Sequence, residues 1–128
     1  MISGIIPTIS VMIKCSQGDV VLIPFPFTDL TTFKQRPALI LSSNSFNSRN
    51  QDVIVVAITS HIPDQLPEDS FLLISSDLER AGLPKKSLVK LGKIVTIDQR
   101  LVRKKLGALP PVTLSKILIP LQSIFGIV

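Results

Sequence analysis

Two short stretches of the sequence carry side chains suited to binding a phosphate group. In KQRPALILSS, Arg36 directly precedes Pro37 at the head of an apolar run, and the residue before a proline is biased toward an extended backbone. Thr59 and Ser60 end another apolar run further along the chain. Arginine presents a planar fork of donors that matches two phosphate oxygens, and hydroxyls add further donors. If the two apolar runs are neighbouring strands, these side chains meet at one rim of the sheet.

A plainer interpretation of the same residues stays open at this point. Arg36 could pair with Asp29 on the surface, and Thr59 could be an ordinary strand residue. His61 is the only histidine, which excludes a two-histidine mechanism within one chain and leaves His61 as an auxiliary candidate beside Ser60. Cys15 is the only cysteine, so we expect an inert, semi-buried thiol and no cysteine cluster.

The sequence favours neither a metal site nor a cofactor site. It has no HExxH, GxSxG or paired-cysteine motif, and no glycine-rich phosphate loop follows an apolar run. Asp19, Asp29 and Asp52 could supply carboxylates, but each stands beside the start of an expected strand, where turn and cap roles are commoner. We therefore predict no metal and no cofactor.

The charge of the chain is distributed unevenly. The net charge is +5, yet residues 1–79 hold four basic and eight acidic groups, whereas residues 80–128 hold ten basic groups and one acidic group. Such asymmetry is typical of proteins with a polyanionic partner, although a solvated basic face would look the same.

The apolar runs predict a mainly β domain that ends in a helix. Short runs rich in β-branched residues alternate with turn residues, as in a small barrel or roll. Near the C-terminus, Leu114, Ile117, Leu118, Leu121, Ile124 and Phe125 recur at helical spacing and should form one apolar face. Pro120 falls inside this expected helix, where proline removes a backbone hydrogen bond and kinks the chain. We predict strands at 18–27, 37–43, 52–60, 70–75, 87–91 and 92–98, a capped helical turn from 76 that breaks at Gly82, a strand or short helix at 100–109, a helix at 110–126, and polar loops at 28–35, 44–51 and 61–69.

The length of 128 residues fits one domain. The uncharged residues 1–11 are expected to be a loose tail, with a single domain over residues 12–128. No basic segment precedes an apolar core at the N-terminus, as a signal peptide requires. No apolar run reaches the roughly 18 residues that cross a bilayer. We expect a cytoplasmic protein with no membrane partner, which the single cysteine also fits.

The order of several motifs resembles the PemK/MazF family of toxin endoribonucleases. The motifs are GDVV, PFPFTD, KxRPA, AITS and KIxTID, each weak alone but specific together, and the resemblance covers residue 17 to about residue 126. It implies an SH3-like small β-barrel with a C-terminal helix, acting as a homodimer. It also implies metal-independent cleavage of single-stranded RNA at short sequence motifs, and a cognate antitoxin that fills the RNA groove with an acidic and apolar tail.

The resemblance also assigns roles to residues. It places the catalytic arginine of the family's R-P motif at Arg36, and the catalytic hydroxyl of its A-I-T motif at Thr59. Arg36 suits stabilisation of phosphorane charge better than proton transfer, because a guanidinium hardly deprotonates in proteins. The expected chemistry is attack by the RNA 2′-OH, which leaves 2′,3′-cyclic phosphate and 5′-OH ends. The candidate RNA-binding residues are Lys34, Lys85, Lys86, Lys90 and Lys93.

Two alternatives accompany this interpretation. The same barrel serves non-catalytic toxins that bind DNA gyrase, and a degenerate toxin could keep only protein-binding activity. The presence of both the RPA and the AITS motifs favours the nuclease, since a gyrase binder has no need of both.

Overall fold

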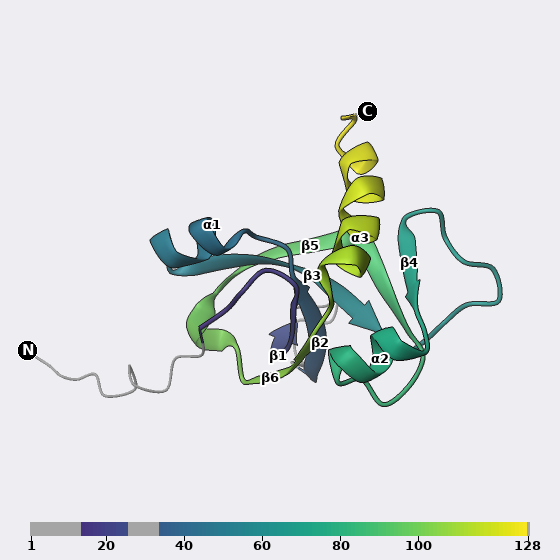
Figure 1. The fold of residues 1–128 in the computed structure, drawn as a ribbon, viewed down its shortest axis with the longest axis horizontal. Helices are drawn as coiled ribbons and strands as arrows, with labels where there is room; N and C mark the ends of the chain where they lie inside the picture. The colour runs from purple at the N-terminus through teal and green to yellow at the C-terminus, as the bar shows by residue number, and fades with distance from the viewer. Residues whose placement is uncertain (1–13, 26–33, 128) are drawn as a thin grey trace, which may run out of the picture.

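The computed structural model describes residues 14–25 and 34–127. In these residues the strands form a single antiparallel sheet with the order β4-β5-β3-β2-β1-β6, which curls into a half-barrel (Figure 1). The predicted mainly β fold with a C-terminal helix is confirmed. The strands are β1 (Asp19–Phe25), β2 (Lys34–Ile40), β3 (Asp52–Thr59), β4 (Ser70–Leu73), β5 (Ser87–Asp98) and β6 (Lys104–Ala108), and the helices are α1 (Asn44–Arg49), α2 (Ser76–Ala81), the 3-10 turn η3 (Gln99–Leu101) and α3 (Pro111–Ile124).

Strand β3 lies between β5 and β2 and carries the core on both of its faces. Val56 and Ile58 point to the side covered by α3, which we call the α3 face, and join a cluster that includes Ile117. Val55 and Ala57 point to the other side, where Cys15 packs, which we call the Cys15 face. Burial on both faces explains why the run is apolar almost throughout and lacks the alternation of a half-buried strand.

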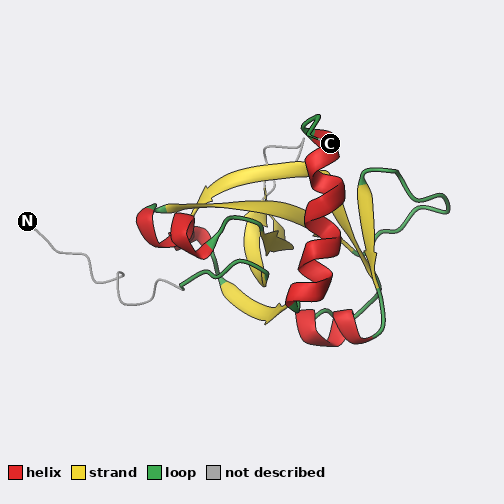
Figure 2. Cartoon of the chain, turned by 45° about the horizontal axis from the view of Figure 1, so that its top comes forward, coloured by secondary structure: helices red, strands yellow, loops and turns green. Residues whose placement is uncertain are grey.

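Helix α3 covers the sheet with α2 at its N-terminal end (Figure 2). Pro111 stands in its first turn, where the missing N–H costs nothing. Ile117 is fully buried, and Leu114, Leu118, Leu121 and Ile124 pack against the same cluster. Phe125 is 63% exposed, so its assignment to the apolar face was wrong. The helix runs through Pro120 to Ile124.

Two predicted strands form one. Residues 87–98 make the continuous strand β5, and the break expected near Gly92 is a change of register: Val56 pairs with Ile94, whereas Ala57 pairs with Lys90. A bulge of this kind leaves the extra residues unpaired and bends the strand. The interpretation of 100–109 as a strand is confirmed for β6, which follows η3.

The polar segment 44–51 was predicted to be a loop, but it contains α1. Ser43 caps this helix, because its hydroxyl accepts a hydrogen bond from the backbone N–H of Phe46 at 3.1 Å. The buried side chain of Asn47 donates to the carbonyls of Cys15 and Ser42. Helices α1 and α2 lie at opposite ends of the sheet (Figure 1).

The other boundaries follow the sequence more closely. Pro24 lies in β1 beyond the last pair with β6, which joins Leu22 and Lys104, so its missing N–H faces no partner strand. Helix α2 ends at Gly82, in the left-handed conformation as a helix end favours. The predicted loose tail at 1–11 lies outside the described residues. Within the described part of the chain, none of the helices is long and apolar enough to cross a membrane.

Candidate functional site

Arg36 is the third residue of β2, where a strand partner fixes its backbone. It was predicted at a loop-to-strand junction, but β1 pairs with this segment as far as Lys34, so the strand begins before the predicted position. Arg36 lies opposite Ile23 of β1. The side chain is half-buried, and its Nε atom is fully enclosed. The guanidinium is therefore held by a rigid element and partly removed from water. Its interaction with an anion is stronger there than in bulk water, because the local dielectric constant is lower.

Thr59 is the last residue of β3 and faces the same end of the sheet. Its hydroxyl accepts a hydrogen bond from the backbone N–H of His61 at 3.1 Å, which makes a tight turn where the strand ends. A hydroxyl that accepts one hydrogen bond can still donate its own hydrogen. The turn therefore fixes the position of the Thr59 oxygen without using its donor.

Strand register brings Arg36 and Thr59 together. Ala38 of β2 pairs with Ala57 of β3, and both point to the Cys15 face. Arg36 and Thr59 each stand two residues further toward the same end, and side chains two apart share a face. Both residues line a cleft of about 200 Å³ and an adjoining cleft of about 320 Å³.

The other predicted site residues divide between those that line these clefts and those that do not. His61, Lys90 and Lys93 line the smaller cleft. Ser60 and Lys85 line the larger one. Lys34 and Lys86 are exposed and line neither cleft.

The walls of the larger cleft were missed by the sequence interpretation. Leu22 of β1 and Leu106 of β6 line it together with the turn Gly82, Leu83 and Pro84. That turn was predicted as a helix break, but no local pattern shows that it returns to Arg36. Gly82 permits the return, because a Cβ there would lie 2.0 Å from the Leu106 carbonyl oxygen.

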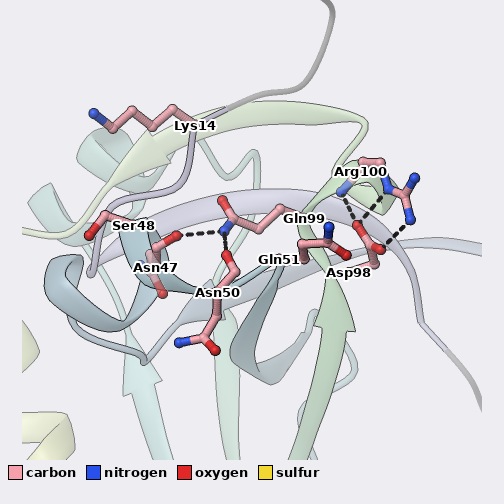
Figure 3. A pocket seen from close by; sticks show the side chains of 8 residues that line it. All are labelled: Lys14, Asn47, Ser48, Asn50, Gln51, Asp98, Gln99 and Arg100. Atoms are coloured by element: carbon pink, nitrogen blue, oxygen red, sulfur yellow. Dashed lines mark hydrogen bonds and ion pairs between the residues drawn. The ribbon is translucent and has the colours of Figure 1, made fainter. Parts of the chain in front are cut away.

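A larger cavity, of about 550 Å³, lies at the other end of β3, between α1 and η3 (Figure 3). Gln99 is 5% exposed and donates its amide hydrogens to the carbonyls of Asn47 and Asn50, at 2.8 and 2.9 Å. These bonds fasten α1 to the end of β5. The sequence interpretation assigned nothing to this region, where the polar residues look like loop residues.

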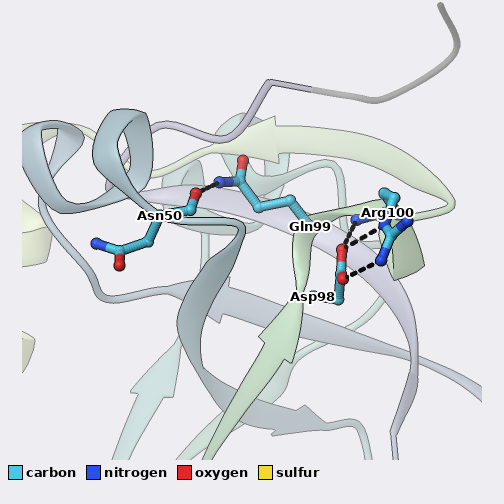
Figure 4. A network of polar contacts seen from close by, with 4 residues as sticks. All are labelled: Asn50, Asp98, Gln99 and Arg100. Atoms are coloured by element: carbon cyan, nitrogen blue, oxygen red, sulfur yellow. Dashed lines mark hydrogen bonds and ion pairs between the residues drawn. The ribbon is translucent and has the colours of Figure 1, made fainter. Parts of the chain in front are cut away.

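Asp98 and Arg100 form a fixed pair beside this cavity (Figure 4). The Arg100 Nε and Nη2 atoms donate to the two carboxylate oxygens at 3.0 and 2.7 Å, and the backbone N–H of Arg100 donates at 2.8 Å. These bonds, the side-chain ones first, lower the pKa of Asp98 to about 2. In the described ranges, no group of three or more His, Cys, Asp or Glu residues is placed to hold a metal ion.

The structure is a small, mainly β domain: a six-stranded antiparallel half-barrel with a C-terminal helix, in which an arginine and a threonine converge at one end of the sheet. The chain belongs to the family of PemK-like, MazF-like toxins of type II toxin-antitoxin systems, whose family model matches residues 16–125. The resemblance of the motifs to this family is confirmed.

Solved structures share the fold at low sequence identity. An endoribonuclease in complex with its cognate antitoxin, from a mycobacterial species, is 23% identical with a TM-score of 0.70, and the match covers 88% of this chain and 95% of that one. Another mycobacterial endoribonuclease is 25% identical with a TM-score of 0.69, covering 91% and 96%. A chain in a MazE–MazF crystal structure from Deinococcus radiodurans is similar at 20% identity and a TM-score of 0.70, and the match covers 91% of this chain and 100% of that one. No curated protein matches the chain by sequence.

Proposed function

We propose that this toxin is an endoribonuclease that cleaves single-stranded RNA in the cleft between Arg36 and Thr59, without a metal ion. The observation that carries the proposal is the convergence of a half-buried guanidinium and a positioned hydroxyl in one cleft, with Lys90 and Lys93 at its wall. This set can bind a phosphodiester and the negative charge that develops on it. Membership of the toxin family and the endoribonucleases among the similar structures support it.

The proposed reaction needs no external nucleophile. The RNA 2′-oxygen forms a bond to the adjacent phosphorus, its proton passes to a base, and the bond from phosphorus to the 5′-oxygen breaks as that oxygen gains a proton. The products are a 2′,3′-cyclic phosphate and a 5′-OH. The fixed charge of Arg36 stabilises the equatorial oxygens of the phosphorane, and Thr59 donates its hydroxyl hydrogen to one of them. His61 is the auxiliary candidate for proton transfer, because imidazole exchanges protons near neutral pH.

The experiment is cleavage of a long single-stranded RNA by the purified protein in EDTA. We expect cleavage to continue, and the new 5′ ends to accept phosphate from a polynucleotide kinase without prior dephosphorylation. Arg36→Ala protein, purified in parallel, controls for contaminating nuclease. A strict requirement for Mg²⁺, or 5′-phosphate products, would contradict the mechanism. Intact RNA with every preparation would favour the gyrase-binding or degenerate alternatives.

The proposed assembly is a homodimer inhibited by a cognate antitoxin. Similar structures include an endoribonuclease in complex with its cognate antitoxin, and the basic C-terminal segment of this chain, residues 80–128, suits an acidic partner segment. The antitoxin tail would fill the cleft at Arg36 with apolar and acidic side chains. Binding of full-length antitoxin should therefore displace RNA, and simultaneous binding of both at Arg36 would contradict this arrangement.

A further inference from the structure

The cavity between α1 and η3 has a mostly apolar lining that contains one buried amide held by hydrogen bonds. Gln99 is almost completely buried, and both hydrogens of its amide are bonded to main-chain carbonyls. These bonds fix which way the amide points, and its oxygen is directed away from them (Figure 3). Within residues 14–25 and 34–127, no group donates a hydrogen bond to that oxygen. The cavity thus contains a rigid acceptor for a ligand N–H group.

Arg100 adds a flat surface to this cavity. Its guanidinium is held by two side-chain hydrogen bonds to Asp98, yet the side chain is 71% exposed. One face of the guanidinium plane is therefore accessible to a ligand. Stacking on it costs little side-chain entropy, because the hydrogen bonds to Asp98 already fix the side chain. Nucleobases stack on guanidinium planes of this kind in RNA-binding proteins. Lys14, on the opposite wall, supplies a positive charge.

We propose that this cavity is a nucleotide subsite. The base stacks on Arg100 and donates an amino hydrogen to Gln99 Oε1, while the phosphate lies near Lys14. An acceptor that cannot rotate favours base edges with an N–H donor: adenine, cytosine and guanine each offer an amino group, whereas uracil offers only its ring N–H. The cavity volume of about 550 Å³ accommodates a ligand of this size.

The position of the cavity connects it with the cleft. Thr59 ends β3 at the cleft, and Asp52 begins β3 beside Asp98 at the cavity. At about 3.3 Å per residue, the eight-residue strand separates the two sites by roughly 20 to 25 Å. Single-stranded binding proteins of this size hold about 4 to 16 nucleotides. One RNA strand is therefore long enough to occupy both sites, and for that occupant the inference rests on the proposed function. A free nucleotide offers the same base and phosphate groups and is the alternative occupant.

The test uses the full chain labelled with ¹⁵N, with the side-chain amide signals of Gln99 as the direct readout. AMP, CMP, ribose 5-phosphate and a 12-nucleotide single-stranded RNA are titrated separately, with the Arg36→Ala protein used for RNA so that it stays intact. We expect AMP and CMP to shift the Gln99 signals and ribose 5-phosphate to leave them in place. A response to RNA identifies a strand as the occupant, and a response to the mononucleotides alone identifies a free nucleotide. The proposal would be overturned if neither the mononucleotides nor the RNA shifted the Gln99 signals, or if ribose 5-phosphate shifted them as much as AMP and CMP do.

A pair of matched variants tests the stacking surface. Arg100→Lys keeps the charge and loses the plane, so affinity for the responding nucleotide should fall on the order of tenfold, as expected when a stacking partner is removed. Arg103→Lys makes the same change at an exposed arginine outside the cavity and should change affinity little. Equal losses in the two variants would overturn the proposal. If Arg100→Lys cleaves RNA normally and binds the nucleotide with unchanged affinity, only the subsite proposal is overturned. If the wild-type protein binds the nucleotide but cleaves no RNA, only the proposed function is overturned.

Discussion

Arg36 is held so that the shape of its side chain, rather than its charge alone, determines the proposed chemistry. Its backbone is part of β2 and its Nε atom is enclosed. Arg36→Lys preserves the charge but loses the planar fork, so we expect the single-turnover cleavage rate to fall by on the order of 10²-fold, as when an oxyanion donor is removed. RNA affinity should change little, because the number of positive charges is the same.

Two measurements make the Arg36 result interpretable. Circular dichroism should show that the variant is folded, since the side chain stands at the end of the sheet. Thr59→Ala should lower the rate by a smaller factor, because it removes one neutral donor, while Thr59→Ser should restore most of it. A folded Arg36→Lys protein that cleaves at the wild-type rate would show that Arg36 supplies only general charge.

The fold changes the acidity of the Cys15 thiol. Burial, assisted by the negative charge of Asp19 and opposed by Lys105, raises the pKa of its thiol to about 11 from 9.0. Since the thiolate is the reactive form, alkylation at pH 8.5 should be much slower in the native protein than in urea. The native state favours the neutral thiol, so this contribution to stability is complete below pH 9 and disappears as the pH rises through 11.

A matched variant isolates that contribution. In Cys15→Ala, the part of the stability loss between pH 9 and 11 that comes from the thiol should be absent. Stability measured by urea unfolding at several pH values checks this, and an identical pH dependence in both proteins would show that the thiol plays no part.

At the scale of elements, the close approach of α2 to β6 shapes the larger cleft. Gly107 lies in β6, and a Cβ there would stand 2.2 Å from the carbonyl oxygen of Arg80 at the end of α2. Gly107→Ala must push α2 away from the sheet, so we expect a loss of about 1 to 3 kcal/mol in the free energy of unfolding. Because the turn after α2 lines the cleft, cleavage should weaken as well.

Gly92 provides the control for this prediction. It also lies in a strand, but a Cβ there would meet nothing within 4 Å. Gly92→Ala should therefore leave stability unchanged or raise it by about 0.5 to 1 kcal/mol, as expected when a strand glycine is replaced. Urea unfolding of both variants compares them directly. Similar stabilities for the two would show that α2 and β6 do not need the close approach.

The elements that the sequence predicted correctly are those with a clear apolar pattern. Helix α3 buries apolar side chains at helical spacing, and strand β3 is a short, almost continuous apolar run bounded by polar residues. Helix α1 was missed because it is held by a cap at Ser43 and by the buried amide of Asn47, neither of which has a periodicity. The continuity of β5 was missed because a bulge and a turn share the same glycine signal.

The candidate site was predicted in its residues but not in its walls. Arg36 and Thr59 each stand beside a recognisable local pattern, whereas Leu22, Leu106 and the turn at Gly82 reach the cleft only through the pairing of β1 with β6 and the packing of α2. The cavity at Gln99 depends on contacts between residues about 50 positions apart. Pairing and contacts between such distant residues cannot be deduced from any local stretch of the sequence.

At the scale of the whole molecule, part of the positive charge of residues 80–128 lies at the cleft. Lys90 and Lys93 line the same cleft as Arg36, whereas Lys104 and Lys116 are exposed elsewhere, on β6 and α3. If the cleft binds RNA, Lys90 and Lys93 contact its phosphates, and each such contact to a single strand contributes about 0.7 to the slope of log K against log salt concentration.

The Lys90→Gln, Lys93→Gln double variant should therefore reduce that slope by about 1.4 and weaken binding at low salt most strongly. The Lys104→Gln, Lys116→Gln protein has the same net charge and should keep nearly the wild-type slope. Titrations of a fluorescent single-stranded RNA at several salt concentrations, with the Arg36→Ala substitution in each protein to prevent cleavage, measure both slopes. Equal slopes in the two double variants would mean that RNA responds to the net charge of the chain and not to the cationic lining of the cleft.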